Sequence, residues 1–121
     1  MIVVARIFSG RPDPRWPLAQ PQTERLLARL QELQALREPF TIAPDGLGYR
    51  GLVVTSENDA SAFDVVHVFD TKVMVRRGEV TEVLADPNRQ LESWLLVTGE
   101  GHVDAETHEL LKQQLQRGAG E

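Results

Sequence analysis

Short runs of apolar residues, and in one stretch a strict alternation of positions, predict the β-strands of this chain. The runs are IVVARIF at residues 2–8 and LVVTS at residues 52–56. FDVVHVFD, at residues 63–70, alternates and places His67 on the face of Phe63 and Val65, which we expect to be the apolar face. TKVMVRRGEVTEVLAD, at residues 71–86, predicts a hairpin that turns near Gly78. Strands so close together in sequence favour an antiparallel meander.

Leucines at spacings of three and four predict an amphipathic helix over residues 23–37. They are Leu26, Leu30, Leu33 and Leu36, and Pro39 is expected to end the helix because proline cannot continue its hydrogen-bond ladder. Ahead of this helix, four prolines between residues 12 and 21 are expected to exclude regular hydrogen-bonded structure. The segment APDGLGYRG, at residues 43–51, predicts a turn that leads into LVVTS.

Two further helices are predicted in the last third of the chain. Asp86 before Pro87 is a helix-start signal, and Gly99 marks the end of that helix, with a short strand through SWLLV as the alternative. Asp104 is the expected N-cap of the last helix, which ends at Gly118. The inward-facing positions are Leu91, Trp94 and Leu95 in the first helix, and His108, Leu111 and Leu115 in the second.

These elements predict one α+β domain over residues 1–121, with a mainly antiparallel sheet of about five strands packed against two or three helices. The composition agrees, because 121 residues with 41% apolar and 26% charged residues are typical of a single globular domain. The chain has no cysteine, which excludes disulfides, cysteine nucleophiles and cysteine-ligated zinc. No apolar run approaches the ~20 residues of a membrane span, and the N-terminus lacks a signal-peptide pattern, so we expect a cytoplasmic protein without a membrane partner.

The net charge of −5 is unevenly distributed along the sequence. The first 60 residues are balanced, whereas residues 61–121 carry the excess of acids. Nucleic-acid binding requires clustered Lys or Arg to neutralise phosphates, and the chain has no basic run, so we expect no nucleic-acid partner. The acidic second half favours a partner with a basic surface.

Motifs that would indicate a cofactor or catalysis are incomplete. The glycines of GLGYRG fit GxGxxG, but a strand follows them where a dinucleotide site requires a helix. HELLK carries Lys112 where the zinc motif HExxH requires a second histidine, so we predict no metal site. His67 is expected to be a hydrogen-bonded core histidine rather than a catalytic base. We therefore predict no catalytic residue and no cofactor, and favour a protein that is not an enzyme.

The segment FSGRPDPRWPL, at residues 8–18, is the best candidate for a binding site. Alternating prolines favour an extended conformation that presents Arg11, Asp13, Arg15 and Trp16 with little loss of entropy on binding. Arg and Trp are also the residue types that dominate binding hot spots. The alternative is that Trp16 covers one end of the core, Arg11 and Asp13 pair locally, and the prolines only direct the chain from strand to helix.

The motifs IFSGRPDPRW and LGYRGLVV carry a resemblance to a group of small uncharacterised bacterial proteins with FSGRPNPxW followed by GYRGF. The likeness covers roughly residues 7–18 and 47–54. Asp13 stands where asparagine is usual, and Leu52 where phenylalanine is usual. The resemblance implies no known activity, but it implies that the two motifs occur together and meet in space. Tyr49 and Arg50 therefore join the candidate binding residues, near Arg11 or Arg15 at one end of the sheet.

The leading hypothesis is a non-catalytic accessory or regulatory protein that binds another protein or peptide in the bacterial cytoplasm. A second hypothesis is a small-molecule or anion site, with or without enzymatic activity, in which Arg11, Arg15 and Arg50 grip a carboxylate or phosphate and Tyr49 or His67 assists. A third is an immunity protein that inhibits a basic toxin with its acidic surface. A homodimer is expected if the N-terminal strand or LVVTS is an unprotected sheet edge.

Overall fold

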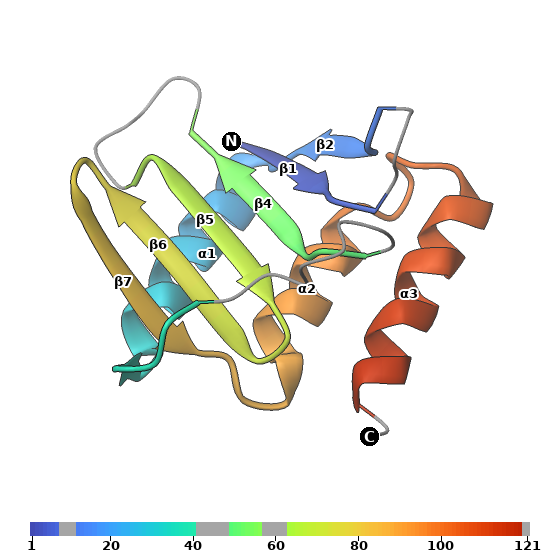
Figure 1. The fold of residues 1–121 in the computed structure, drawn as a ribbon. Helices are drawn as coiled ribbons and strands as arrows, with labels where there is room; N and C mark the ends of the chain where they lie inside the picture. Colours follow the sequence, from blue (N-terminus) through green and yellow to red (C-terminus); the bar gives the residue numbers. More distant parts are fainter. Residues whose placement is uncertain (8–11, 41–48, 57–62, 120–121) are drawn as a thin grey trace.

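The computed structural model describes residues 1–7, 12–40, 49–56 and 63–119, with side chains as far as residue 115. Within these residues, three α-helices and one seven-stranded antiparallel sheet form an α+β fold (Figure 1). The elements are β1 (Ile2–Ala5), β2 (Arg15–Pro17), α1 (Gln20–Glu32), β3 (Ala35–Leu36), β4 (Leu52–Thr55), β5 (Val65–Phe69), β6 (Lys72–Arg77), β7 (Val80–Ala85), the 3-10 turn η1 (Pro87–Arg89), α2 (Gln90–Thr98) and α3 (Ala105–Ala119). The strand order is β2-β1-β4-β5-β6-β7-β3. The predicted fold class is confirmed, and the strand count of about five is too low.

The meander of β5, β6 and β7 is confirmed, and its turns use residues with left-handed backbone. Asp70 and Thr71 join β5 to β6 at φ values of 51° and 70°. Gly78, at φ 60°, lies in the turn between β6 and β7, where the sequence predicts it. Each connection is two residues long, and positive φ at such turn positions matches the twist of the strands that they join.

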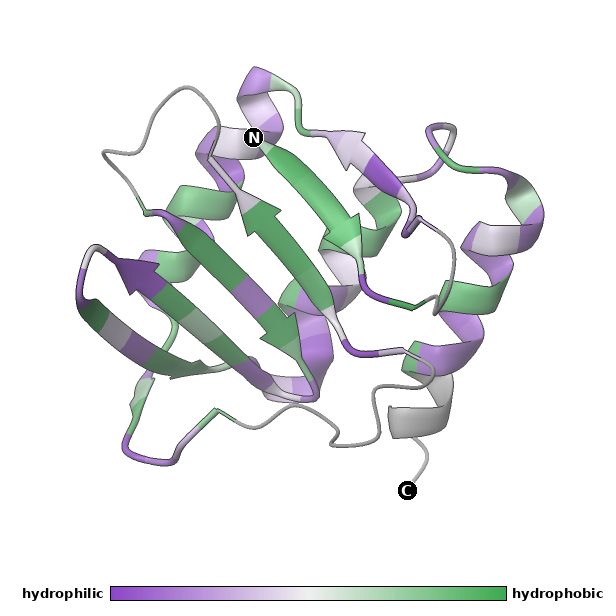
Figure 2. Cartoon of the chain, turned by 45° about the horizontal axis from the view of Figure 1, so that its top comes forward, coloured by the Kyte–Doolittle hydropathy of each residue, from purple (hydrophilic) through white to green (hydrophobic). Residues whose placement is uncertain are grey.

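The core lies on one face of the sheet, which α1 and α2 cover, while α3 packs beside α2 (Figure 1). Strand pairing aligns Val3, Val54, Val66 and Val75 across four strands, and all four are buried. Hydropathy is highest in the central strands and low in β2 (Figure 2). On β5, the face packed against the helices carries Val66 and Val68 rather than His67. The prediction that His67 shares the core face of this strand is therefore wrong.

The proline-rich segment forms a strand, which corrects the prediction that its prolines exclude regular structure. Trp16 of β2 pairs with Val3 of β1, and the Pro14 carbonyl accepts the Ala5 N–H at 2.9 Å. Proline lacks a donor but keeps its acceptor, and β2 is an edge strand, so the missing donors cost no ladder hydrogen bond there.

Helix α1 begins three residues before the predicted start and ends five residues before the predicted end. Pro21 lies in its first turn, where a proline N–H is not needed. At the other end, Leu36 leaves the leucine stripe because it pairs with Val83 in β7, and Ala35 pairs with Leu84. The two strands missing from the predicted count are thus the short edges β2 and β3.

Strands β1 and β4 are each paired on both sides, β1 with β2 and β4, and β4 with β1 and β5. Neither is an edge, so the condition for a homodimer through these strands is not met. The predicted helices α2 and α3 are confirmed, and the alternative strand through SWLLV is wrong. None of the helices in the described ranges is long and apolar enough to cross a bilayer.

Candidate functional site

Trp16 is a core residue, with 1% of its surface exposed. Its indole N–H donates to Thr98 Oγ1 at 2.9 Å, and Thr98 Oγ1 in turn donates to the Leu95 carbonyl. The indole also lies against Gly99, where a Cβ would stand 2.7 Å from the ring. This arrangement agrees with the alternative in which Trp16 covers the core and is not presented at the surface.

Asp13 and Arg50 each contact Arg6, the residue that follows β1. The Asp13 carboxylate accepts the Ile7 N–H at 3.1 Å and lies 3.8 Å from Arg6 Nε. The Arg50 N–H donates to the Arg6 carbonyl at 2.6 Å. Residues of both motifs therefore contact the segment that follows β1, which lies between β2 and β4 in the sheet. Arg11 lies outside the described residues, so its predicted pairing with Asp13 stays a prediction.

Arg15 and Tyr49 point away from each other, which separates the predicted binding residues. Arg15 is exposed and precedes the buried Trp16 on β2, so its side chain lies on the opposite sheet face. Tyr49 is buried, and its hydroxyl donates to Glu92 Oε2 on α2. The described members of the set do not converge on one ligand.

The partner of Tyr49 belongs to a buried polar cluster that the sequence reasoning missed. Glu92 is fully buried, accepts hydrogen bonds from Arg89 Nε at 2.7 Å and Arg89 Nη2 at 2.9 Å, and accepts the Asp70 N–H at 3.2 Å. The Arg89 guanidinium and the other donors therefore compensate the charge of this buried carboxylate. The cluster thereby connects the segment before β4, the β5–β6 turn and the start of α2.

Electrostatics fix the protonation states in this cluster. Burial, and then the adjacent carboxylate of Glu92, raise the pKa of Tyr49 far above its ordinary value. Burial lowers the pKa of Arg89, but its hydrogen bonds and charge pairing with Glu92 outweigh burial and raise the pKa overall. Tyr49 is therefore a neutral donor and Arg89 a permanent cation, an arrangement suited to holding the fold.

Asp86 caps α2 as its position before Pro87 predicts, but it acts across a kink. Its carboxylate accepts the N–H groups of Leu91 at 2.8 Å and Glu92 at 3.1 Å, because Asn88 and Arg89 adopt left-handed backbone between them. Burial raises the pKa of Asp86, and these two hydrogen bonds oppose the rise.

His67 is buried and hydrogen-bonded, as predicted, although it lies on the face away from α1 and α2. Its Nε2 is 2.8 Å from the Arg50 carbonyl, and the Phe40 ring lies 4.9 Å from the imidazole. Because a carbonyl can only accept, Nε2 carries the proton in this contact. Burial lowers the pKa of His67, the hydrogen bond opposes that shift, and the charge of Arg6 adds to it.

The lowered pKa of His67 predicts a loss of stability in mild acid. Below about pH 6.5 the unfolded chain binds a proton at this histidine that the folded chain does not, so the free energy of unfolding falls as the pH falls. The slope from one proton is at most about 1.4 kcal/mol per pH unit. Urea denaturation from pH 7.5 to 5 should show this slope, and His67→Gln should reduce it. His102→Gln, at an exposed position, is the control, and equal slopes in all three proteins would contradict the prediction.

The described residues contain no group of three or more His, Asp or Glu side chains placed to hold a metal ion. His108, one of the histidines considered for such a site, is buried against α2, with Nε2 3.0 Å from the Leu96 carbonyl. Its backbone N–H donates to the Asp104 carbonyl at the start of α3. His108 thus connects α3 to α2.

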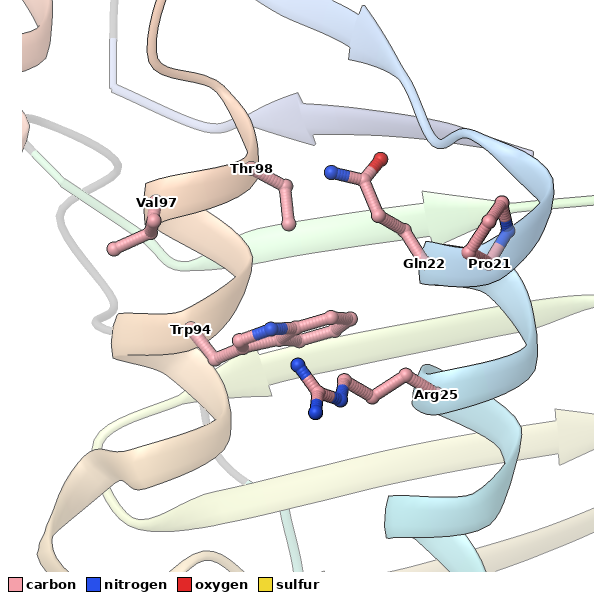
Figure 3. A pocket seen from close by; sticks show the side chains of 6 residues that line it. All are labelled: Pro21, Gln22, Arg25, Trp94, Val97 and Thr98. Atoms are coloured by element: carbon pink, nitrogen blue, oxygen red, sulfur yellow. The ribbon is translucent and has the colours of Figure 1, made fainter.

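A hollow of about 420 Å³ opens between α1 and α2 on the side away from the sheet (Figure 3). Its lining residues are Pro21, Gln22 and Arg25 of α1, and Trp94, Val97 and Thr98 of α2. Val97 is 58% exposed, and the Trp94 indole lies between the helices with the Arg25 side chain close by (Figure 3). Arg29, one turn beyond Arg25, places its guanidinium 5.2 Å from the centroid of the Trp94 ring. We call this feature the α1/α2 groove.

Comparison with known proteins places the chain in no family. No family model matches it, and neither a curated protein nor a solved structure is significantly similar to it. The resemblance of its two motifs to the FSGRPNPxW proteins stays a prediction.

Sequence reasoning placed Trp94 on the inner face of a helix and did not single out Arg25 or Val97. The leucine spacing of α1 predicted which face of this helix is buried, but it did not predict that α2 lies beside another face. The available signal was the pair Arg25 and Arg29, four residues apart and therefore on one helix face. Only the packing of α1 against α2 brings that face to Trp94.

Proposed function

We propose that this chain is a non-catalytic accessory or regulatory protein that binds another protein or peptide in the bacterial cytoplasm. The observation that supports it is the α1/α2 groove, where the half-buried Trp94 and the exposed Val97 lie beside Arg25. Tryptophan and arginine are among the residue types that dominate protein-binding hot spots. The buried Tyr49, Glu92 and Arg89 are engaged with one another, which suits a structural role.

Site-specific photocrosslinking tests this proposal. Val97 and Val80 are 58% and 60% exposed, but only Val97 lines the groove. With p-benzoylphenylalanine at position 97, irradiation in a lysate of the source organism should yield a discrete protein adduct that position 80 does not yield. The added variant Trp94→Ala should reduce the adduct at position 97. Identical adducts at both positions, or none at position 97, would contradict binding in the groove.

A small-molecule or anion site is the second candidate, and the size of the hollow favours it. A volume of about 420 Å³ falls within the range typical of small-ligand sites. In this case Arg25 and Arg29 would supply the cations at the hollow, while the set of Arg11, Arg15 and Arg50 stays a prediction, because Arg11 lies outside the described residues. Thermal-shift screening of carboxylates and phosphates distinguishes the candidates, because a ligand that binds the folded chain raises its unfolding temperature.

The third proposal, a partner with a basic surface, has support from α3 and the turn before it. Glu100, Asp104, Glu106 and Glu109 are all exposed there. Such a cluster would steer a basic protein, including a basic toxin, towards this end of the molecule. Binding of that kind would weaken with salt and would not depend on Trp94.

A further inference from the structure

The α1/α2 groove is longer than its main hollow. A second hollow of about 100 Å³ lies further along the same helices, lined by Arg29, Glu32, Leu33, Asp86, Pro87, Gln90 and Leu91. The start of α1 lies opposite the end of α2 in the first hollow, and the end of α1 lies opposite the start of α2 in the second. The helices are therefore antiparallel, and the two hollows follow one another along one groove. Arg29, over the Trp94 ring, lies at their junction.

Charge changes sign along this groove. Among the described residues that line the main hollow, Arg25 is the one charged residue, so this part is cationic. The second hollow holds Arg29 together with Glu32 and Asp86, and the Asp86 carboxylate already accepts two backbone N–H groups. No ion pair to Arg25 occurs among the residues that the structure describes.

The helix dipole adds to the positive end. The first turn of α1, at the Pro21 side of the main hollow, contains no acidic residue. The positive end of a helix is ordinarily complemented by an acid in that turn, and here none is supplied by the helix itself. The partial positive charge of this helix end therefore adds to the cationic character that Arg25 gives the main hollow.

We propose that the groove binds an acidic peptide segment of a partner protein, with a carboxylate at Arg25 and an adjacent apolar side chain against Trp94 and Val97. This inference rests on the proposed binding function and adds the chemistry of the bound segment. Arginine recognises a carboxylate through two parallel hydrogen bonds, and the indole and valine supply apolar area next to it. Glu32 disfavours a second acid at the far end, so the acidic residue lies at the α1 start.

Selection from a phage-displayed library of random nine-residue peptides tests separately whether the groove binds a peptide and whether that peptide is acidic. The wild type should enrich peptides that combine Asp or Glu with an aromatic or aliphatic residue, and Trp94→Ala should not retain them. If no groove-dependent peptide is enriched, the binding function and this inference both fail. If groove-dependent peptides are enriched but are neutral or basic, the binding function stands and this inference fails.

A charge swap on a selected peptide gives the quantitative test. Fluorescence anisotropy should show Arg25→Glu weakening the acidic peptide about tenfold or more, and the same peptide with Lys in place of its acid should recover affinity for this variant. Arg37→Glu makes the same charge change at an exposed position outside the groove and should have little effect. The proposal would be overturned if Arg25→Glu and Arg37→Glu weakened binding of the peptide equally. It would also be overturned if free acetate or phosphate displaced the labelled peptide as well as the unlabelled peptide does. Circular dichroism confirms that each variant is folded.

Discussion

Replacing Glu92 with alanine should lower the free energy of unfolding by about 3–5 kcal/mol, the cost of breaking a buried ion pair by removing one partner. The carboxylate is fully buried and accepts from Arg89, Tyr49 and the Asp70 N–H. Without it, the Arg89 cation and two further donors remain in the interior with no acceptor. Urea denaturation followed by circular dichroism measures the change.

Two comparisons make the Glu92 result specific. Glu109→Ala removes an exposed carboxylate from α3 and should change stability by no more than about 0.5 kcal/mol. The double variant Arg89→Met with Glu92→Leu removes both charges and should be clearly more stable than Glu92→Ala, because no buried charge is left unpaired. A loss for Glu92→Ala no larger than that of the Glu109 variant would show that the cluster does not stabilise the fold.

Replacing Trp16 with alanine should cost about 3–5 kcal/mol, the usual range for truncating a buried tryptophan. The side chain is 1% exposed, fills the space beside Gly99 and donates to Thr98. Total stability of a domain is about 5–15 kcal/mol, so this loss leaves a substantial unfolded fraction on mild heating. Thermal and urea denaturation both report it.

Arg15→Ala is the matched control for Trp16, because the two residues are adjacent on β2 and point to opposite faces. Arg15 is exposed, and its truncation should cost no more than about 0.5 kcal/mol. Similar losses for the two variants would contradict the assignment of Trp16 to the core. The contrast also decides how residues 8–18 are tested for binding. Arg15→Ala changes the surface alone, whereas Trp16→Ala would lose binding through unfolding.

Local pattern predicted the elements whose signals lie within a few neighbouring residues. The alternation of FDVVHVFD and the glycine turn at Gly78 predicted β5, β6 and β7, and the apolar spacing after Asp86 and Asp104 predicted α2 and α3. The same reasoning failed at β2 and β3. Edge strands of three and two residues form because a partner strand is already in place, and their own residues carry no strand signal.

The candidate site shows the same division. Residue types pointed to Arg, Trp and Tyr as binding groups, and burial then separated them. Trp16 and Tyr49 turn inward to Thr98 and Glu92, which lie 82 and 43 residues further along the chain. No periodicity encodes contacts over such separations.

By itself the sequence determined an α+β domain, the central meander, the two C-terminal helices and the unequal distribution of charge, since each follows from composition or short-range periodicity. Tertiary structure alone decided the sheet order, the pairing of Tyr49 and Arg89 with Glu92, and the groove that brings Arg25 to Trp94. The physical reason is that burial and long-range pairing depend on which surfaces meet when the helices pack on the sheet, and one-dimensional spacing does not specify those meetings.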